Sequence, residues 1–307
     1  MELAEKANGL LGLDIPWHLK ATYEVFGPDG KSTDAGTYEE WRLNANQYRI
    51  AFHSPSISAE EFGTDHGVFG TGQEGWPRKP LSSIPAMIAQ PVRSPVNPEK
   101  IRLENYERTF GGAKMPCTAL IYSGWNLTAQ DADGYCFATT NAILVYATQR
   151  DRLIQTLFQQ IALVHGHYFA NDMQLLLEGK PWLKVHIDQL EGLSTTGQQA
   201  LTVPAGASPV TGHASASRDI TAGRLVKRVA PEYPLAAKQQ GVRGTVILEG
   251  VVNTEGHVQE LRVLAGPSML HQAAIDAVKQ WVYTPYFLAG KAVDQEIEFY
   301  VEFALPR

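Results

Sequence analysis

The last strand-like stretch of the chain, residues 293–303, constrains the fold more than any other part of the sequence. Its side chains alternate between two rows, which is the period of a β-strand with one buried face and one solvent-exposed face. One row contains Val293, Gln295, Ile297, Phe299, Val301 and Phe303, and the other contains Asp294, Glu296, Glu298, Tyr300 and Glu302. A hairpin and an amphipathic helix precede this strand, so we expect it to close a small α+β unit and to leave an open sheet edge.

The hairpin and the helix are marked by turn signals and by helical periodicity. Residues 244–252 and 257–265 are predicted strands, joined by a turn that ends at Gly256. Apolar side chains then recur at helical spacing from Leu270 to Trp281, which predicts one buried helical face. This pattern defines a C-terminal domain over residues 224–307.

The sequence ahead of this domain predicts a flexible linker and a β-rich domain. Residues 194–223 are dominated by small, polar, proline and glycine residues, which bury too little apolar area to order themselves. Residues 1–193 contain a short leading helix and many strand-like stretches separated by turns, with weak helical periodicity. We therefore predict a mainly β protein whose N-terminal domain is a curved antiparallel sheet.

Composition and motifs exclude several classes of function. The 307 residues are long enough for two domains, and the formal charge of −6 gives no support for nucleic-acid binding. The sequence has no phosphate-binding loop, no Gly-x-Ser-x-Gly motif and no zinc-protease helix, so we expect no enzyme activity and no cofactor. His165 and His167 share a strand face without a convincing third ligand in the sequence, so we expect no metal.

The chain as given has no run of about twenty apolar residues, and its first residues do not form a signal peptide. Either the protein is cytoplasmic, or an export segment or anchor is missing from this sequence. The two cysteines, Cys117 and Cys136, lie in strand-like stretches that could pair and bring the thiols together. A disulfide would indicate an oxidising compartment, and the alternative is two buried free cysteines.

Residues 1–193 faintly resemble the lipoprotein-carrier fold of the LolA and LolB type. The resemblance is carried by the stretch 16–23, the strand 36–41 and the hairpin 175–190. It implies a half-open barrel with an apolar cavity for an acyl chain. The implied lining residues are Tyr23, Tyr48, Phe52 and Leu120. The alternative is a filled core without a ligand, because an aromatic row at strand spacing usually reflects packing.

Residues from about 224 to 303 resemble the TonB C-terminal domain specifically. The motif positions are a Tyr-Pro pair, a Gly-x-Val strand, a turn ending in glycine, an aromatic residue and a proline after the helix, and a glycine turn before the last strand. In this sequence they are Tyr233, Pro234, Gly244, Gly256, Trp281, Pro285 and Gly290.

The TonB resemblance implies a periplasmic coupling or adaptor protein that supports energy-dependent transport. Such proteins couple to inner-membrane motor proteins and bind a short segment of an outer-membrane transporter by adding it as a strand. The implied partner-binding edge comprises Gln295, Glu296, Ile297, Glu298, Phe299, Tyr300 and Val301. The chain departs from the family at its front, where a β domain replaces the usual anchor and proline-rich spacer. A lipid or lipoprotein carrier is the alternative function, and a homodimer formed by strand exchange is a further arrangement for this kind of domain.

Overall fold

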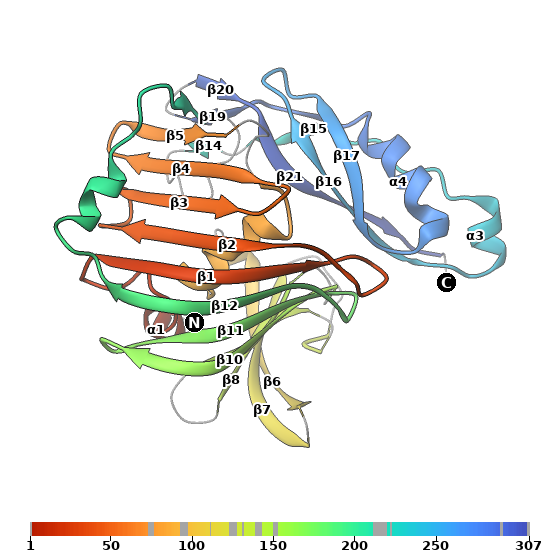
Figure 1. Ribbon diagram of the computed structural model, residues 1–307. Helices are drawn as coiled ribbons and strands as arrows, with labels where there is room; N and C mark the ends of the chain where they lie inside the picture. The colour runs from red at the N-terminus through yellow and green to blue at the C-terminus, as the bar shows by residue number, and fades with distance from the viewer. Residues whose placement is uncertain are drawn as a thin grey trace. The chain divides into compact units, whose positions relative to one another are not determined.

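A computed structural model describes residues 2–72, 77–92, 98–110, 112–122, 128–130, 132–138, 143–149, 153–210, 220–221, 223–288 and 291–305 (Figure 1). The fold is mainly β, as the sequence predicts. The chain divides into two compact units, Met1–Pro209 and Val210–Arg307. Among the helices in these ranges, none is both long enough and apolar enough to span a membrane.

The N-terminal unit is built on one antiparallel sheet with the strand order β13-β5-β4-β3-β2-β1-β12-β11-β10-β9-β8-β7-β6. The sheet curves strongly along this order (Figure 1). In chain order the strands are β1 (Trp17–Phe26), β2 (Ser32–Arg42), β3 (Tyr48–His53), β4 (Ser58–Thr64), β5 (Gly67–Thr71), β6 (Ile101–Phe110), β7 (Ala113–Tyr122), β8 (Asp133–Ala138), β9 (Ile143–Gln149), β10 (Ile154–Val164), β11 (His167–Leu177), β12 (Lys180–Gly192) and β13 (Ser208–Pro209).

Two short helices lie on one side of this sheet, behind it in Figure 1: α1 (Glu2–Ala7) and α2 (Ile84–Ala89). Helix α2 follows a 3-10 turn, η1 (Leu81–Ser83), and buries nearly all of its side chains. A second 3-10 turn, η2 (Pro98–Lys100), leads into β6. The core of the unit is formed by the alternate residues of the strands that face these helices, such as Trp17, Leu19, Ala21 and Tyr23 of β1.

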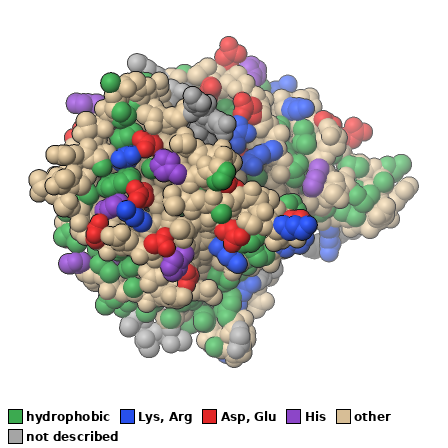
Figure 2. Space-filling view, in the orientation of Figure 1, with side chains coloured by type: hydrophobic (Ala, Val, Ile, Leu, Met, Phe, Trp, Pro, Cys, Tyr) green, Lys and Arg blue, Asp and Glu red, His purple; other side chains and the backbone are tan. Residues whose placement is uncertain are grey.

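The opposite face of the sheet is polar and carries acidic, basic and histidine side chains side by side (Figure 2). One row of stacked side chains on this face crosses the strands β1, β2 and β3. The His18 ring stacks on Trp41 with centroids 4.8 Å apart, and the Arg49 guanidinium lies 4.5 Å from the centroid of Trp41. Cross-strand pairs of this kind stabilise a sheet from its solvent side.

The structure of the N-terminal unit differs from the expectation in two respects. Strand β6 was not expected, because residues 101–110 contain glutamates and arginines at positions where an amphipathic strand would have apolar ones. Strand β4 begins at Ser58, ahead of the hairpin expected from Gly63. In addition, the stretch expected to begin a flexible linker at residue 194 has structure. It forms a 3-10 helix, η3 (Gly197–Leu201), and then β13, which pairs with β5, so the unit extends to Pro209. Backbone hydrogen bonds hold this stretch although its side chains are small.

The C-terminal unit contains a three-stranded antiparallel sheet of order β17-β16-β21. Its strands are β16 (Gly244–Val252), β17 (Val258–Ala265) and β21 (Gln295–Phe303). The helical segments are α3 (Leu235–Gln239), η4 (Ser268–Leu270) and α4 (His271–Val278). Short strands complete the unit: β14 (Ile220–Thr221), β15 (Leu225–Lys227), β18 (Val282–Tyr283), β19 (Tyr286–Leu288) and β20 (Lys291–Val293).

The last strand is shorter than the alternation predicts. Val293 belongs to β20, which pairs with β19, and β21 begins only at Gln295. Between them, the carboxylate of Asp294 accepts a hydrogen bond of 2.9 Å from the backbone N–H of Thr254, in the turn between β16 and β17. This contact holds the chain where it passes from one sheet to the other.

Candidate functional site

Strand β21 is the candidate functional site because it is a regular strand at the edge of its sheet. It pairs with β16 at nine successive positions, from Gln295 opposite Val252 to Phe303 opposite Gly244, without a register shift. Among the described residues, no further strand of this sheet lies on the other side of β21. Every second residue of an edge strand directs its backbone N–H and C=O away from the sheet, so an edge strand is where a partner strand would add to this sheet.

The opposite edge of the sheet is less suited to strand addition. The ladder between β17 and β16 shifts register twice, and Glu260 within β17 has a positive φ of 54°. Bulges of this kind twist an edge strand and interrupt the regular spacing of its hydrogen-bonding groups. Of the two edges, β21 therefore offers the longer unbroken template.

The apolar face of β21 holds it against the rest of the unit. Phe299, Val301 and Phe303 are buried in the core, where the Trp281 ring contacts Phe299 edge-on with centroids 6.2 Å apart. The indole N–H of Trp281 donates a hydrogen bond of 2.8 Å to the carbonyl oxygen of Val229. The strand is thus fixed in position by the side chains of its apolar face.

The other side of β21 carries Glu296, Glu298, Tyr300 and Glu302. The Tyr300 hydroxyl donates a hydrogen bond to the carboxylate of Glu298, two residues away on the same face. Across the sheet, Glu298 lies opposite Glu249 of β16, and Glu249 is ion-paired with Arg262 of β17.

The motif positions that the sequence singled out have structural roles around this strand. The Tyr233 hydroxyl donates a hydrogen bond of 2.5 Å to the carbonyl oxygen of Val242, and Pro234 precedes the first turn of α3. Gly244 begins β16 with a φ of 139°, a conformation that favours glycine. Pro285 lies between β18 and β19. The last motif position, Gly290, lies outside the described residues.

Gly256 is the motif residue with the clearest steric requirement. Its φ is 86°, and a Cβ atom added to it would lie 1.9 Å from the carbonyl oxygen of Tyr283. The backbone of the turn therefore passes directly against β18, and the Tyr283 N–H donates a hydrogen bond of 2.9 Å to the carbonyl oxygen of Gly256. Burial raises the pKa of the Tyr283 hydroxyl to about 12.

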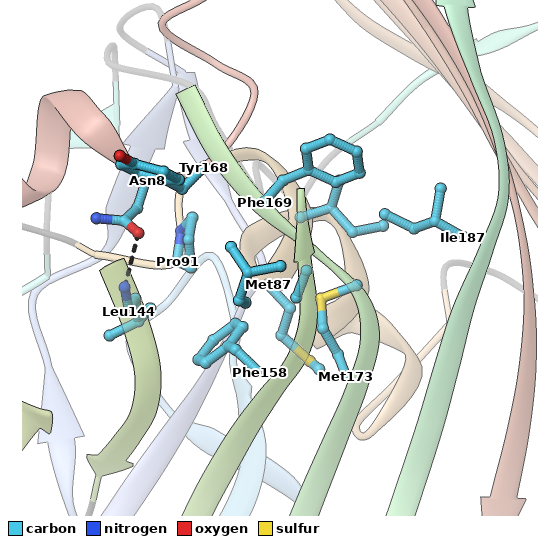
Figure 3. Close-up of a pocket in the computed structure, with 12 residues that line it drawn as sticks. Asn8, Met87, Pro91, Leu144, Phe158, Tyr168, Phe169, Met173 and Ile187 are labelled. Atoms are coloured by element: carbon cyan, nitrogen blue, oxygen red, sulfur yellow. Dashed lines mark hydrogen bonds between the residues drawn. The ribbon is translucent and has the colours of Figure 1, made fainter. Parts of the chain in front are cut away.

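The N-terminal unit contains a second candidate site, an apolar void beside α2. Figure 3 shows Met87 of α2 facing Phe158, Phe169 and Met173 of the sheet. The cavity measures about 10 Å³, which is space for about one water molecule and not for an acyl chain. Asn8 closes one end, because its side-chain oxygen accepts a hydrogen bond of 2.8 Å from the Leu144 N–H.

The four residues expected to line an acyl-chain cavity are all packed in the core and do not line this void. Tyr23, Tyr48, Phe52 and Leu120 are each less than 10% exposed. The Phe52 ring contacts Tyr23 and Tyr38, with centroids 6.3 Å and 5.0 Å away. Only Tyr23 also borders a shallow groove of about 470 Å³, whose other lining residues come from β1, β2, β10, β11 and β12.

A buried polar cluster in this core was not anticipated. Tyr48 donates a hydrogen bond to Glu61, and Arg42 donates one of 2.6 Å to Glu40, which also accepts a hydrogen bond from Tyr38. Burial raises the pKa of Glu61 to about 7, against the opposing effects of the Tyr48 hydrogen bond and the Arg42 charge. The alternation of Tyr38, Glu40 and Arg42 along one strand face is the sequence signal that could have found it.

Cys117 and Cys136 form a disulfide between directly opposite residues of β7 and β8, which confirms the proposed pairing. In the described part of the chain, no group of three or more histidine, cysteine or acidic side chains is arranged to hold a metal ion.

Comparison with known proteins finds a match to one protein family within the C-terminal unit. Residues 229–305 match the family model described as Gram-negative bacterial TonB protein C-terminal. The chain is 35% identical over 80 residues to Protein TonB of Vibrio cholerae and 38% identical over 78 residues to Protein tonB2 of Pseudomonas aeruginosa. Each match covers 25% of this chain, and 33% and 29% of the two relatives.

Solved structures of other proteins also align with part of this chain. A LolA superfamily protein from Nitrosomonas europaea aligns over 66% of this chain and 95% of its own, at 8% identity and a TM-score of 0.43. The C-terminal match is of a different kind, because sequence and motif positions agree over one continuous segment. The resemblance to the TonB C-terminal family, indicated by the motif from Tyr233 to Pro285, is therefore confirmed for residues 229–305.

Proposed function

We propose that this chain is a periplasmic coupling or adaptor protein of the TonB type. In this proposal its C-terminal unit binds a short segment of an outer-membrane transporter, or of another envelope protein, by strand addition at β21, and so supports energy-dependent transport. The match spans about a third of the length of the TonB relatives, so their activity and partners are carried over here as a hypothesis. Inner-membrane motor proteins are the second class of partner that this hypothesis implies. No catalytic step is part of it.

The observation that carries the proposal is the regular edge of β21. The strand pairs with β16 at nine successive positions without a register shift, and it is an edge strand in the described part of the sheet. A short partner segment would gain about four to six backbone hydrogen bonds of about 1 kcal/mol each, less the cost of ordering the segment. The expected affinity is modest, which suits a contact that must form and release. The disulfide between Cys117 and Cys136 agrees with an oxidising compartment such as the periplasm.

Backbone recognition can be tested with alternately N-methylated peptides and the full chain. An extended transporter-derived peptide is made in three forms: unmodified, N-methylated at odd positions and N-methylated at even positions. Only every second N–H of an added strand points at its neighbour, so strand addition predicts that one methylated form loses binding and the other retains it. Equal binding by both methylated forms would contradict the proposal.

The binding site is mapped in the same titration by the amide signals of selectively labelled valine, isoleucine and phenylalanine. The signals of Ile297, Phe299 and Val301 are expected to shift. Val258 and Val263 on the other edge of the sheet serve as internal controls. Shifts confined to those controls, or to the N-terminal unit, would place binding elsewhere and count against β21.

A second candidate function is a lipid or lipoprotein carrier that uses the interior of the N-terminal unit. The observation that favours it is the contact between α2 and the sheet, which is apolar and includes the adaptable side chains of Met87 and Met173. Because the void holds only about one water molecule, an acyl chain would have to displace α2. Native mass spectrometry of gently extracted protein and displacement of a fluorescent lipid test this function. If no lipid is detected by mass spectrometry and the fluorescent lipid is not displaced, the carrier function is wrong.

A further inference from the structure

Strand β6 lies beside β7 at one end of the N-terminal sheet (Figure 1). The two strands pair at ten successive positions without a register shift, from Ile101 opposite Tyr122 to Phe110 opposite Ala113. Within the described part of the chain, no strand lies on the other side of β6. Leu103 on this strand is 50% exposed although its side chain is apolar. A long, regular edge of this kind is a place where another strand adds to a sheet.

The direction of the backbone groups along β6 follows from the neighbouring strands. Cys117 of β7 and Cys136 of β8 are directly opposite each other, with Cα atoms 4.0 Å apart. This short separation is typical of a non-hydrogen-bonded pair, so the backbone N–H and C=O of Cys117 point toward β6. The residue of β6 opposite Cys117 is Tyr106. Tyr106 and the other even-numbered residues of β6 therefore bond to β7, and the odd-numbered residues direct their N–H and C=O outward.

This alternation limits how a second copy of the chain can pair with β6. In a two-fold symmetric pair the interface is formed by the same surface of both copies. Hydrogen bonds form between outward-directed residues, so odd-numbered residues face odd-numbered ones and even-numbered residues face even-numbered ones. The two-fold axis then passes between one residue of β6 and its own copy. Registers with a long overlap have this residue near the middle of the strand, between Glu104 and Glu107.

The charges on β6 distinguish these registers. An axis at Glu104 or at Glu107 places that glutamate opposite its own copy, and an axis one residue before Tyr106 places Arg102 opposite Arg108 twice. Like charges directly opposite each other destabilise a strand pair. An axis at Tyr106 instead places Glu104 opposite Arg108 on both sides of the axis. Of these registers, it alone brings opposite charges together.

The side chains of Arg108 and Glu104 have the capacity for this contact. The Arg108 guanidinium lies 5.3 Å and 4.6 Å from the ring centroids of Phe110 and Tyr146. Among the described residues it has no ion-pair partner, and its Nη1 atom is buried without a hydrogen bond. Glu104 is 3.3 Å from Arg102 through one oxygen and is 43% exposed, and a carboxylate accepts hydrogen bonds from more than one cation.

We infer that a second copy of this chain binds antiparallel at β6, with the two-fold axis at Tyr106, and continues the N-terminal sheet. The outward-directed residues then exchange about eight backbone hydrogen bonds across the interface; they are Leu103, Asn105, Glu107 and Thr109. The two Tyr106 side chains and the pairs of Glu104 with Arg108 occupy non-hydrogen-bonded positions, where side chains are closest. This interface belongs to the N-terminal unit and does not depend on strand addition at β21.

Sedimentation velocity of the full chain over a wide range of concentrations tests this inference. The wild type is expected to shift with concentration toward a species of twice the mass of one chain. Arg108→Glu places two glutamates opposite each other on each side of the axis, and Glu104→Arg places two arginines there. Each variant should weaken the dimer about thirtyfold, because two favourable pairs become unfavourable.

Charge exchange makes the test specific to this register. An equal mixture of the Arg108→Glu and Glu104→Arg variants should recover the dimer, because each copy then supplies the charge that the other requires. The double variant Glu104→Arg, Arg108→Glu should recover it alone. Arg102→Glu is the control, because it makes the same charge change on the same strand but lies opposite Phe110 in this register, and it should keep the dimer. Circular dichroism checks that all variants fold.

Three results would overturn the inference. The first is a wild type that stays monomeric at all concentrations. The second is a dimer that is insensitive to both Arg108→Glu and Glu104→Arg, because another surface, such as the C-terminal unit, would then join the copies. The third is a mixture of the two variants that stays monomeric while each variant is folded, because the register centred on Tyr106 requires their charges to complement each other.

Discussion

The phenolic hydroxyl of Tyr48 donates a hydrogen bond of 2.7 Å to one carboxyl oxygen of Glu61, and the other oxygen, also buried, has no hydrogen-bond partner among the residues that the structure describes. The Arg42 guanidinium lies 4.6 Å from the Tyr48 ring centroid but is paired with Glu40. Within the described part of the chain, Glu61 is thus a buried acid without an ion-pair partner of its own. Burial without full compensation favours the protonated form of a carboxyl group.

Replacing Glu61 with glutamine should remove a pH-dependent loss of stability. The pKa of Glu61 is about 7 in the folded protein against an ordinary value of 4.5, so the folded state binds the proton more tightly than the unfolded state. The stabilisation is fully present below pH 4.5, declines as the pH rises, and is lost above about pH 7. The difference in the free energy of unfolding between wild type and Glu61→Gln should therefore change by about 3 kcal/mol over this pH range.

Urea unfolding at pH 5 and at pH 8 measures this effect. The variant is expected to gain stability relative to wild type at pH 8. Glu104→Gln on β6 is the control, because it makes the same substitution at a partly exposed carboxylate outside the buried cluster. An equal wild-type-to-variant difference at the two pH values would show that the ionisation of Glu61 is not coupled to folding.

Gly256→Ala should destabilise the C-terminal unit much more than Gly241→Ala. Both glycines have positive φ, 86° and 67°, so both variants bear the left-handed backbone cost of about 1 kcal/mol. Only the Cβ at position 256 meets another atom, because nothing lies within 4 Å of a Cβ at position 241. Thermal unfolding should separate the two variants, and similar losses would mean that the turn relaxes away from Tyr283.

Trp281→Ala should loosen the attachment of β21 to its unit. The indole ring is 4% exposed, contacts Phe299 and is hydrogen-bonded to Val229, and truncation of such a side chain costs about 3–5 kcal/mol. Hydrogen exchange of β16 and β21 should accelerate while that of β1 and β12 stays unchanged. Leu235→Ala is the control, because Leu235 is 70% exposed. Unchanged exchange in β21 would show that the strand is held by other contacts.

Removing the disulfide should destabilise the N-terminal unit. The bond joins residues 19 positions apart, and closing a loop of this size contributes about 3 kcal/mol in the chain-entropy model. The double variant Cys117→Ala, Cys136→Ala and the wild type under reducing conditions should lose similar stability in urea unfolding. The reducing agent should leave the double variant unaffected, and an effect on that variant would point to a cause other than this bond.

The parts of the fold that could be predicted are those where one residue pattern dominates the local energy. In the C-terminal unit, the predicted strand 244–252 agrees with β16, and the helical apolar face ending at Trp281 covers the core side of that sheet. The N-terminal strands β1, β2 and β3 were likewise predictable from alternation and from the turn before Gly30. Local pattern and tertiary packing agree at these positions.

Prediction was poorest where tertiary contacts outweigh local pattern. Glu61 of β4 is buried against Tyr48 of the neighbouring strand β3, and a single strand sequence does not show that such a partner will be supplied. The stretch after residue 193 has a linker-like composition, yet β5 offers it backbone hydrogen bonds. For β21, the strand and its buried face could be predicted from the sequence, but its position at an edge depends on the order of all strands in the sheet.

The pairing of Ser208 and Pro209 with β5 also limits how copies of the protein can assemble. A sheet polymerises end to end only if both of its outer strands can accept a neighbour, as in cross-β fibres. On the β5 side the outermost described strand, β13, is two residues long and ends in a proline, which has no N–H to donate. Growth of the N-terminal sheet from that side is therefore blocked, and any joining of two copies through β6 would stop at a pair.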